Sequence, residues 1–164
     1  MSFSYLTCNE PSLEKPWVLP LIWFLSLNSS AAIRLRVLSK RFLEERVRVG
    51  IPGFMTWGIV YEFLRVSTHR KVFPKPLSLK KSISFIDTLF ETGVISVLVE
   101  QENHRETLMR ISSEVSSLEG NLLHDVHTAA LMREHGIERI YTHDSDFLRF
   151  KFLEVVNPWE PRSN

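Results

Sequence analysis

The chain has 164 residues, a length that favours a single domain. Its 44% hydrophobic and 24% charged residues are typical of a globular protein and exclude a disordered or fibrous chain. Twenty Lys and Arg balance nineteen Asp and Glu, so the net charge of +1 gives no indication for or against a nucleic-acid partner. Any basic surface must therefore be local.

The longest apolar run, Val18 to Leu25, is well short of the roughly 20 residues that span a bilayer. A signal peptide is the alternative interpretation. However, Glu10 and Glu14 precede the run with only Lys15 as a basic group, which is the wrong charge for such a segment. The single cysteine, Cys8, excludes an internal disulfide and fits a reducing compartment. We therefore expect a cytoplasmic protein that does not associate with membranes.

Strands and helices alternate along the sequence. The predicted elements are a strand at 17–25, a helix at 31–46, a break at 52–53, a helix at 57–68, a helix at 79–91 after an N-cap at Ser78, a strand at 94–99, helices at 103–117 and 121–135, a strand at 137–141 and a last strand at 152–156. This order predicts an α/β fold with a small, mostly parallel sheet flanked by helices on both faces. The expected organisation is an irregular N-terminal extension at 1–16, one domain at 17–159 and a C-terminal tail at 160–164.

Two aspartates, Asp144 and Asp146, directly follow the predicted strand 137–141. In parallel sheets, sites form at the carboxyl ends of the strands, so this segment is the best-placed candidate. The two carboxylates fit either of two roles. They are N-caps for the turn at 147–150, or they are part of a metal site.

Two further acids lie in helices with apolar neighbours. Asp125 is near the start of the helix 121–135, and its helical neighbours are small or apolar; Glu62 is in the otherwise apolar helix 57–68. Two carboxylates about 4 Å apart repel each other by roughly 4 kcal/mol at an effective dielectric near 20. A divalent cation such as Mg²⁺ or Mn²⁺ removes that repulsion. If the acids converge, they predict a hydrolytic metal site that polarises a phosphate and activates a water.

At this point a family resemblance becomes specific. The segments Gly120–Leu131 and Thr142–Phe147 resemble the C-terminal half of a PIN domain, and they are similar to the VapC toxins of bacterial toxin–antitoxin pairs. The segments Glu62–Phe73, Pro76–Ser78 and Asn157–Pro158 are similar to the same subgroup. The likeness covers about residues 42–159.

The resemblance implies a PIN-like fold and a Mg²⁺- or Mn²⁺-dependent endoribonuclease that hydrolyses RNA. It also implies a small antitoxin protein as inhibitor and a possible homodimer. By position, Glu62, Asp125 and Asp144 match the metal-site acids, and Asp146 matches an additional acid. Asp125 and Asp144 would hold the metal, Glu62 would bind it or orient its water, and Thr142 would support the site by hydrogen bonding.

One acid of the family pattern is missing. PIN domains carry an aspartate at the end of the first strand, but no Asp or Glu occurs here between Glu14 and Glu44. Three explanations stay open: a catalytically impaired relative, a substitute ligand from Glu10 or Glu14, or a frameshift in which Leu21-Ile22 hides an Asp codon one base out of register. We rank impairment, by mutation or frameshift, above a substitute ligand.

Basic residues near Glu62 are the predicted contacts to RNA phosphates: Arg65, His69, Arg70 and Lys71, on the same helix and its exit loop. A second basic group fits an RNA contact or a solvated helix face equally well, and consists of Arg34, Arg36, Lys40, Arg41, Arg46 and Arg48.

The remaining candidate groups have simpler interpretations. No Cys or His pairing completes a zinc site, so His124, His127 and His143 are predicted to be exposed near the mouth of the site. Trp17 and Trp57 are predicted to be core residues. Exposed apolar surface on the first helices is a candidate docking surface for an antitoxin helix or a second copy. The alternative function is an inactive PIN-like protein that only binds an antitoxin or RNA; a phosphatase for small substrates ranks third.

Overall fold

The structure is a computed structural model that describes residues 15–19, 30–116, 120 and 122–157, with side chains described from residue 40 onward in the first helix. Its elements are β1 (Trp17–Val18), α1 (Ser30–Val49), β2 (Gly53–Thr56), α2 (Trp57–Ser67), α3 (Leu79–Glu91), β3 (Ile95–Leu98), α4 (His104–Glu114), α5 (Leu122–Glu134), β4 (Arg139–Tyr141), the 3₁₀ helix η3 (Ser145–Arg149) and β5 (Glu154–Val156).

The strands form one sheet in the order β3-β2-β1-β4-β5, and every neighbouring pair is parallel. Val18 in the central strand β1 lies between Phe54 of β2 and Ile140 of β4. The predicted α/β fold with a parallel sheet is confirmed. Within the part of the chain that the structure describes, no helix is long and apolar enough to cross a membrane.

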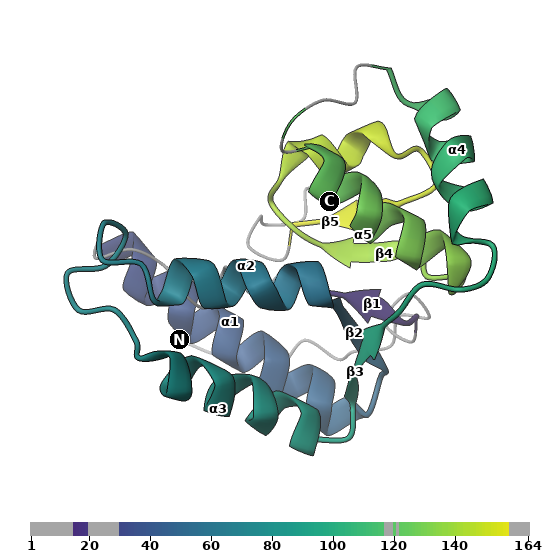
Figure 1. Ribbon diagram of the computed structural model, residues 1–164. Helices are drawn as coiled ribbons and strands as arrows, with labels where there is room; N and C mark the ends of the chain where they lie inside the picture. The colour runs from purple at the N-terminus through teal and green to yellow at the C-terminus, as the bar shows by residue number, and fades with distance from the viewer. Residues whose placement is uncertain (1–14, 20–29, 117–119, 121, 158–164) are drawn as a thin grey trace, which may run out of the picture.

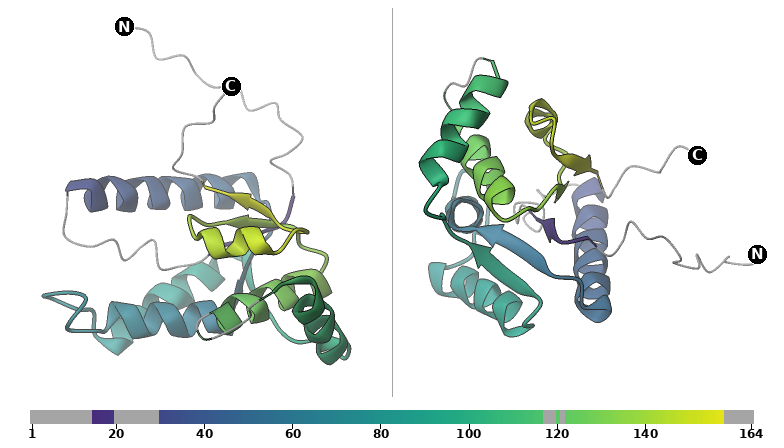
Figure 2. Two further views of the ribbon diagram at one scale, coloured as in Figure 1. Left: turned by 90° about the horizontal axis from the view of Figure 1, so that it is seen from above. Right: turned by 90° about the vertical axis from the view of Figure 1, so that its right-hand side faces the viewer.

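Each face of the sheet has its own hydrophobic core, because successive side chains of a strand point to opposite faces. Trp17 and Leu19 join a cluster with residues of α1, α2 and α3, whereas Val18 joins a cluster with residues of α4, α5 and η3. Figure 1 shows the strands between these two groups of helices, and Figure 2 shows α1 opposite the α4–α5 pair. The helices therefore flank both faces, as predicted.

Strand β2 was missed in the sequence, where Pro52-Gly53 indicates only a break. The strand is short, and its first residue is a glycine for a local reason. A Cβ atom on Gly53 would lie 2.6 Å from the indole ring of Trp17, so only glycine allows β2 to approach β1 here. Beyond residue 19, the predicted strand 17–25 lies outside the described residues, as do most of the predicted extension and the whole tail.

Two predicted helix ends are confirmed at the residues that cap them. Ser78 Oγ accepts a hydrogen bond from Lys81 N at 3.3 Å, and Gly136 has a φ of 64° just after α5. The second basic group contains an exception to the predicted solvated face. Arg46 is buried, with its guanidinium 5.0 Å from the ring centres of both Phe42 and Tyr141.

Two apolar residues are well exposed. Trp57 is 50% exposed, although it was predicted to be a core residue, and Ile83 is 43% exposed. Both lie between α2 and α3, which are held together by a buried hydrogen bond of 2.8 Å between Ser67 and Ser82. Trp17 is buried as predicted.

Candidate metal centre

The segment after β4 is organised by short-range hydrogen bonds. Thr142 is buried, and its Oγ1 accepts a hydrogen bond from Asp144 N at 3.0 Å. Asp144 Oδ1 then accepts from Asp146 N at 2.9 Å and caps η3. Asp146 Oδ1 accepts from Arg149 Nε at 3.3 Å. The capping interpretation is therefore right for Asp144, but the cap occupies only one of its two carboxylate oxygens.

The third aspartate comes from the first turn of α5. Burial and the negative charges of Asp144 and Asp146 together raise the pKa of Asp125 from 3.8 to about 6, with burial the largest cause, while His124 acts in the opposite direction. The structure therefore brings together three acids that are far apart in the sequence, at the edge of the sheet where β4 ends.

These three carboxylates offer the hard oxygen atoms that Mg²⁺ and Mn²⁺ prefer, and a cation there would relieve their mutual repulsion. The donor chemistry therefore fits such an ion. However, no group of three or more His, Cys, Asp or Glu residues in the described ranges is arranged to hold a metal as the side chains lie. The three aspartates alone form an incomplete set of ligands.

Glu62 is paired with a residue of its own helix. Its two carboxylate oxygens accept hydrogen bonds from Arg65 Nε at 2.9 Å and Nη2 at 2.6 Å. Among the described residues, the charges that act on Asp125 are those of Asp144, Asp146 and His124. The Arg65 side chain is likewise occupied by Glu62, whereas His69, Arg70 and Lys71 are exposed.

The end of the first strand is where the family pattern would place another acid. Strand β1 lies in parallel register between β2 and β4, so its carboxyl end is directed to the same edge as the aspartates. Leu19 is the last described residue of this segment, and Pro20 and Leu21 follow it in the sequence. The expectations for Leu21-Ile22, Glu10 and Glu14 lie outside the described residues.

The histidines differ in their surroundings. His124 and His143 are exposed, as predicted. His127 is instead paired with Glu100, with 2.9 Å between Nε2 and Oε1. Sequence reasoning gave no reason to expect this pairing, because Glu100 lies 27 residues earlier in the chain.

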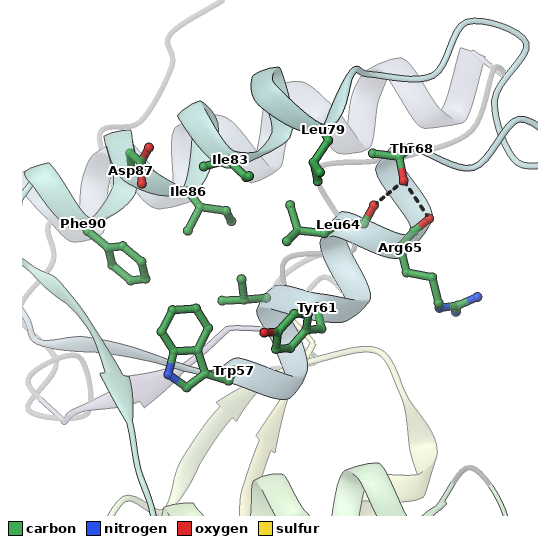
Figure 3. Close-up of a pocket in the computed structure, with 11 residues that line it drawn as sticks. Trp57, Tyr61, Leu64, Arg65, Thr68, Leu79, Ile83, Ile86, Asp87 and Phe90 are labelled. Atoms are coloured by element: carbon green, nitrogen blue, oxygen red, sulfur yellow. Dashed lines mark hydrogen bonds between the residues drawn. The ribbon is translucent and has the colours of Figure 1, made fainter.

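An apolar groove between α2 and α3 was also missed. Its volume is about 640 Å³, and its lining includes Trp57, Tyr61, Leu79, Ile83 and Phe90. Figure 3 shows these side chains facing one another from the two helices. The sequence contained a signal for it, since the apolar residues of 57–68 form a stripe that covers more than half of the helix circumference, which is wider than one packed face needs.

A profile of the PIN domain family matches residues 21–153. The chain belongs to the PIN domain family. The match includes all four candidate acids. Ribonuclease VapC48 from Mycobacterium tuberculosis is 31% identical over 119 residues, which are 71% of this chain and 81% of that protein. Ribonuclease VapC43 from the same species is 27% identical over 129 residues, covering 79% and 84%.

Solved structures show the same fold. VapBC2 from Rickettsia felis, bound to a DNA fragment from their promoter, has a TM-score of 0.59 at 14% identity and covers 85% of this chain and 96% of that one. VapBC-1 from nontypeable Haemophilus influenzae has a TM-score of 0.58 at 18% identity, with 88% and 99% covered. This PIN domain is therefore similar in sequence to VapC ribonucleases and in fold to chains of VapBC assemblies.

Proposed function

We propose that this PIN domain is a VapC-type endoribonuclease that hydrolyses RNA phosphodiester bonds with a divalent cation held by Asp125 and Asp144. The observation that carries the proposal is the convergence of Asp125 with Asp144 and Asp146, which leaves the three acids mutually repulsive. The names of the related ribonucleases support the choice of RNA as substrate. The donor chemistry supports Mg²⁺ or Mn²⁺.

The residues of the site have separate tasks in this proposal. A bound Mg²⁺ or Mn²⁺ would polarise the phosphate and activate a water, with no covalent intermediate. Thr142 and the η3 cap fix the orientation of Asp144. Asp125 is mostly ionised at pH 7, since its pKa is about 6. Glu62 would join the site only after it leaves Arg65.

RNA phosphates would be bound by the basic residues that follow Glu62. His69, Arg70 and Lys71 lie beyond the end of α2 and are exposed, which supports this role. Arg65 is on the same helix, but its guanidinium is engaged by Glu62. Its contribution would therefore depend on an exchange of partners.

The antitoxin partner is proposed to dock an apolar helix in the groove between α2 and α3. The groove is apolar and its side chains Trp57 and Tyr61 are 50% and 68% exposed, which fits a helix-in-groove contact. The VapBC structures support a partner of this class. Tyr61→Asp should weaken antitoxin binding at least tenfold, while Met109→Asp, at an exposed residue of α4, should not. Equal binding by both variants would show that the antitoxin binds outside the groove. If the protein instead dimerises at high concentration without antitoxin, and Tyr61→Asp abolishes this dimer, the groove binds a second copy of the chain.

The test of the proposed activity is cleavage of a structured RNA by the purified protein with Mn²⁺ or Mg²⁺. A variant with both Asp125→Asn and Asp144→Asn is the control. We expect metal-dependent cleavage that the control lacks and that EDTA stops. Equal cleavage by the wild-type and control proteins would exclude the aspartates as its cause.

A second candidate is an inactive PIN domain that only binds an antitoxin or RNA. It is favoured by the absence of Asp and Glu between Glu14 and Glu44, and by the pairing of Glu62 with Arg65. If the wild-type protein does not cleave RNA, Leu21→Asp should restore metal-dependent activity under this interpretation. Cleavage by the wild-type protein excludes it.

A further inference from the structure

Helix α5 is attached to the connection between β3 and α4 by a group of polar contacts away from the aspartates. We call the contact of residues 99–104 with α5 and His135 the α5 seam. Glu134, the last residue of α5, is at its centre. Its Oε2 accepts a hydrogen bond from Gln101 N at 3.0 Å, and its Oε1 is 2.6 Å from His104 Nδ1.

The Glu134 side chain has 0% exposed surface, so its two bonds cannot be replaced by water without rearrangement. A buried carboxylate is costly unless its oxygens are satisfied. The seam therefore defines the position of the end of α5 sharply, because moving the helix would break both bonds at once.

Two further contacts tie α5 to the same connection. His127 Nε2 pairs with Glu100 Oε1 at 2.9 Å, and His135 Nε2 is 2.8 Å from the carbonyl oxygen of Val99. His127 and Glu134 are seven residues apart, which is about two turns, so they lie on one face of α5. Figure 1 shows the connection passing the C-terminal end of α5.

Asp125 lies at the other end of the helix and on a different face. It precedes His127 by two residues, which is a rotation of about 200° in an α-helix. On that side it meets the negative charges of Asp144 and Asp146. Without a cation, these charges push the first turn of α5 away from β4.

Apolar packing holds α5 against the sheet, and the seam adds directional contacts to it. The completely buried residues of α5 include Ala129, Ala130 and Met132, and Val126 and Leu131 are 1% exposed. This packing keeps the helix close to the sheet. Hydrogen bonds are directional, so the seam also fixes the rotation of the helix and its position along its own axis.

We propose that Glu134 is a positioning residue that, through the α5 seam, holds Asp125 close to Asp144 and Asp146 against their charge repulsion. The proposal rests on the proposed function in one respect, since the position matters because the aspartates bind a cation. Its mechanical part concerns the metal-free protein alone.

The mechanical part is tested by a double-mutant cycle in the metal-free protein, with Glu134→Ala and Asp144→Asn measured by urea unfolding. Asp144→Asn keeps a capping oxygen but removes a repelling charge. We expect it to lower the unfolding equilibrium constant about fivefold in the wild-type background, and about twofold or less once Glu134→Ala has released α5. Additivity within about twofold, which is normal for distant residues, would overturn the proposal. If Glu134→Ala does not fold, His104→Ala, which removes one of the two bonds, takes its place.

Glu114→Gln is the matched control for the cycle. Glu114 also binds the last turns of α5, through two hydrogen bonds from Arg133 at 3.0 and 2.7 Å, but it comes from α4 and not from the seam. Its combination with Asp144→Asn should be additive. Coupling of equal size in this control would show a general loosening of α5 and would overturn the role of Glu134.

The link to function is tested by Mn²⁺ binding to folded protein, measured by calorimetry. Glu134→Ala should weaken binding about tenfold, Glu134→Gln less because it keeps an acceptor for Gln101 N, and Glu114→Gln not at all. If Glu134 has a merely structural role, Glu134→Ala lowers the urea midpoint but leaves the Mn²⁺ affinity of the folded protein unchanged. That result would overturn the proposal. If coupling is found but the wild-type protein binds no Mn²⁺, the proposed metal site fails while the positioning role stands.

Discussion

The two helices that contribute candidate acids place them in opposite electrostatic surroundings. On α2, Glu62 is held by the guanidinium of Arg65 through two hydrogen bonds, and its side chain is 42% exposed. On α5, Asp125 is partly buried and faces two other carboxylates, which together with burial raise its pKa to about 6.

The difference separates a surface ion pair from a site. A paired, exposed glutamate is common on helices and contributes little to stability. A group of like charges costs free energy and is maintained only by the rest of the fold, so it indicates a function. The proposed chemistry is therefore centred on the edge formed by α5 and β4, and in this proposal α2 contributes only after a rearrangement.

The largest effect on activity is expected for Asp125, and the same measurement on Glu62 gives a direct comparison of the two acids. Asp125→Asn should reduce metal-dependent RNA cleavage by about 100-fold or more, because it removes a ligand from the proposed centre. Glu62→Gln should reduce it by about tenfold or less. Initial rates at saturating Mn²⁺ measure both, and a larger loss for Glu62→Gln would show that the ion pair on α2 opens in the active protein.

The second prediction concerns the pH dependence of metal binding. A proton on Asp125 competes with the cation, so Mn²⁺ affinity should be constant above about pH 7 and fall by about tenfold per unit below the pKa of about 6. Calorimetric titrations at pH 5, 6 and 7.5 check this. In Asp125→Asn the remaining dependence should shift to lower pH; an unchanged profile would assign it to another group.

The third prediction concerns stability in the absence of metal. Because the folded state raises the pKa of Asp125 from 3.8 to about 6, its contribution favours folding below pH 3.8 and is lost as the pH rises through 6. Allowing for its partial exposure, Asp125→Asn should stabilise the protein by about 1–2 kcal/mol at pH 7 and by little at pH 4. Urea unfolding at both pH values measures the difference, and a variant that is less stable at pH 7 would contradict the repulsion.

The smallest effect is expected for the ion pair on α2. Arg65→Gln should change the free energy of unfolding by at most about 0.5 kcal/mol, because both partners are exposed. Glu114, whose pKa is lowered by Arg133, is the opposite case to Asp125. Its replacement by Gln should destabilise the folded protein at pH 7, whereas Asp125→Asn should stabilise it. A large decrease in the free energy of unfolding in Arg65→Gln would mean that the contact between Arg65 and Glu62 is more than a surface ion pair.

The sequence predicts the elements best where local chemistry defines them, as at the Ser78 cap and the Gly136 end. Strand β2 was missed because Gly53 is required by a contact with Trp17 that local sequence does not reveal. The meeting of Asp125 with Asp144 follows from their positions at a helix start and a strand end. The pairing of Glu62 is a rotamer choice between neighbours on one helix, and pattern alone does not determine it.

The proposed function depends on the binding of a divalent cation at the edge between α5 and β4. Its most direct test is a crystal structure of the protein grown with Mn²⁺, with the metal located by anomalous scattering. We expect a peak at about 2.1–2.2 Å from carboxylate oxygens of both Asp125 and Asp144. Ordered aspartates without a peak between them, at Mn²⁺ concentrations that support metal-dependent enzymes, would contradict the presence of a cation site here.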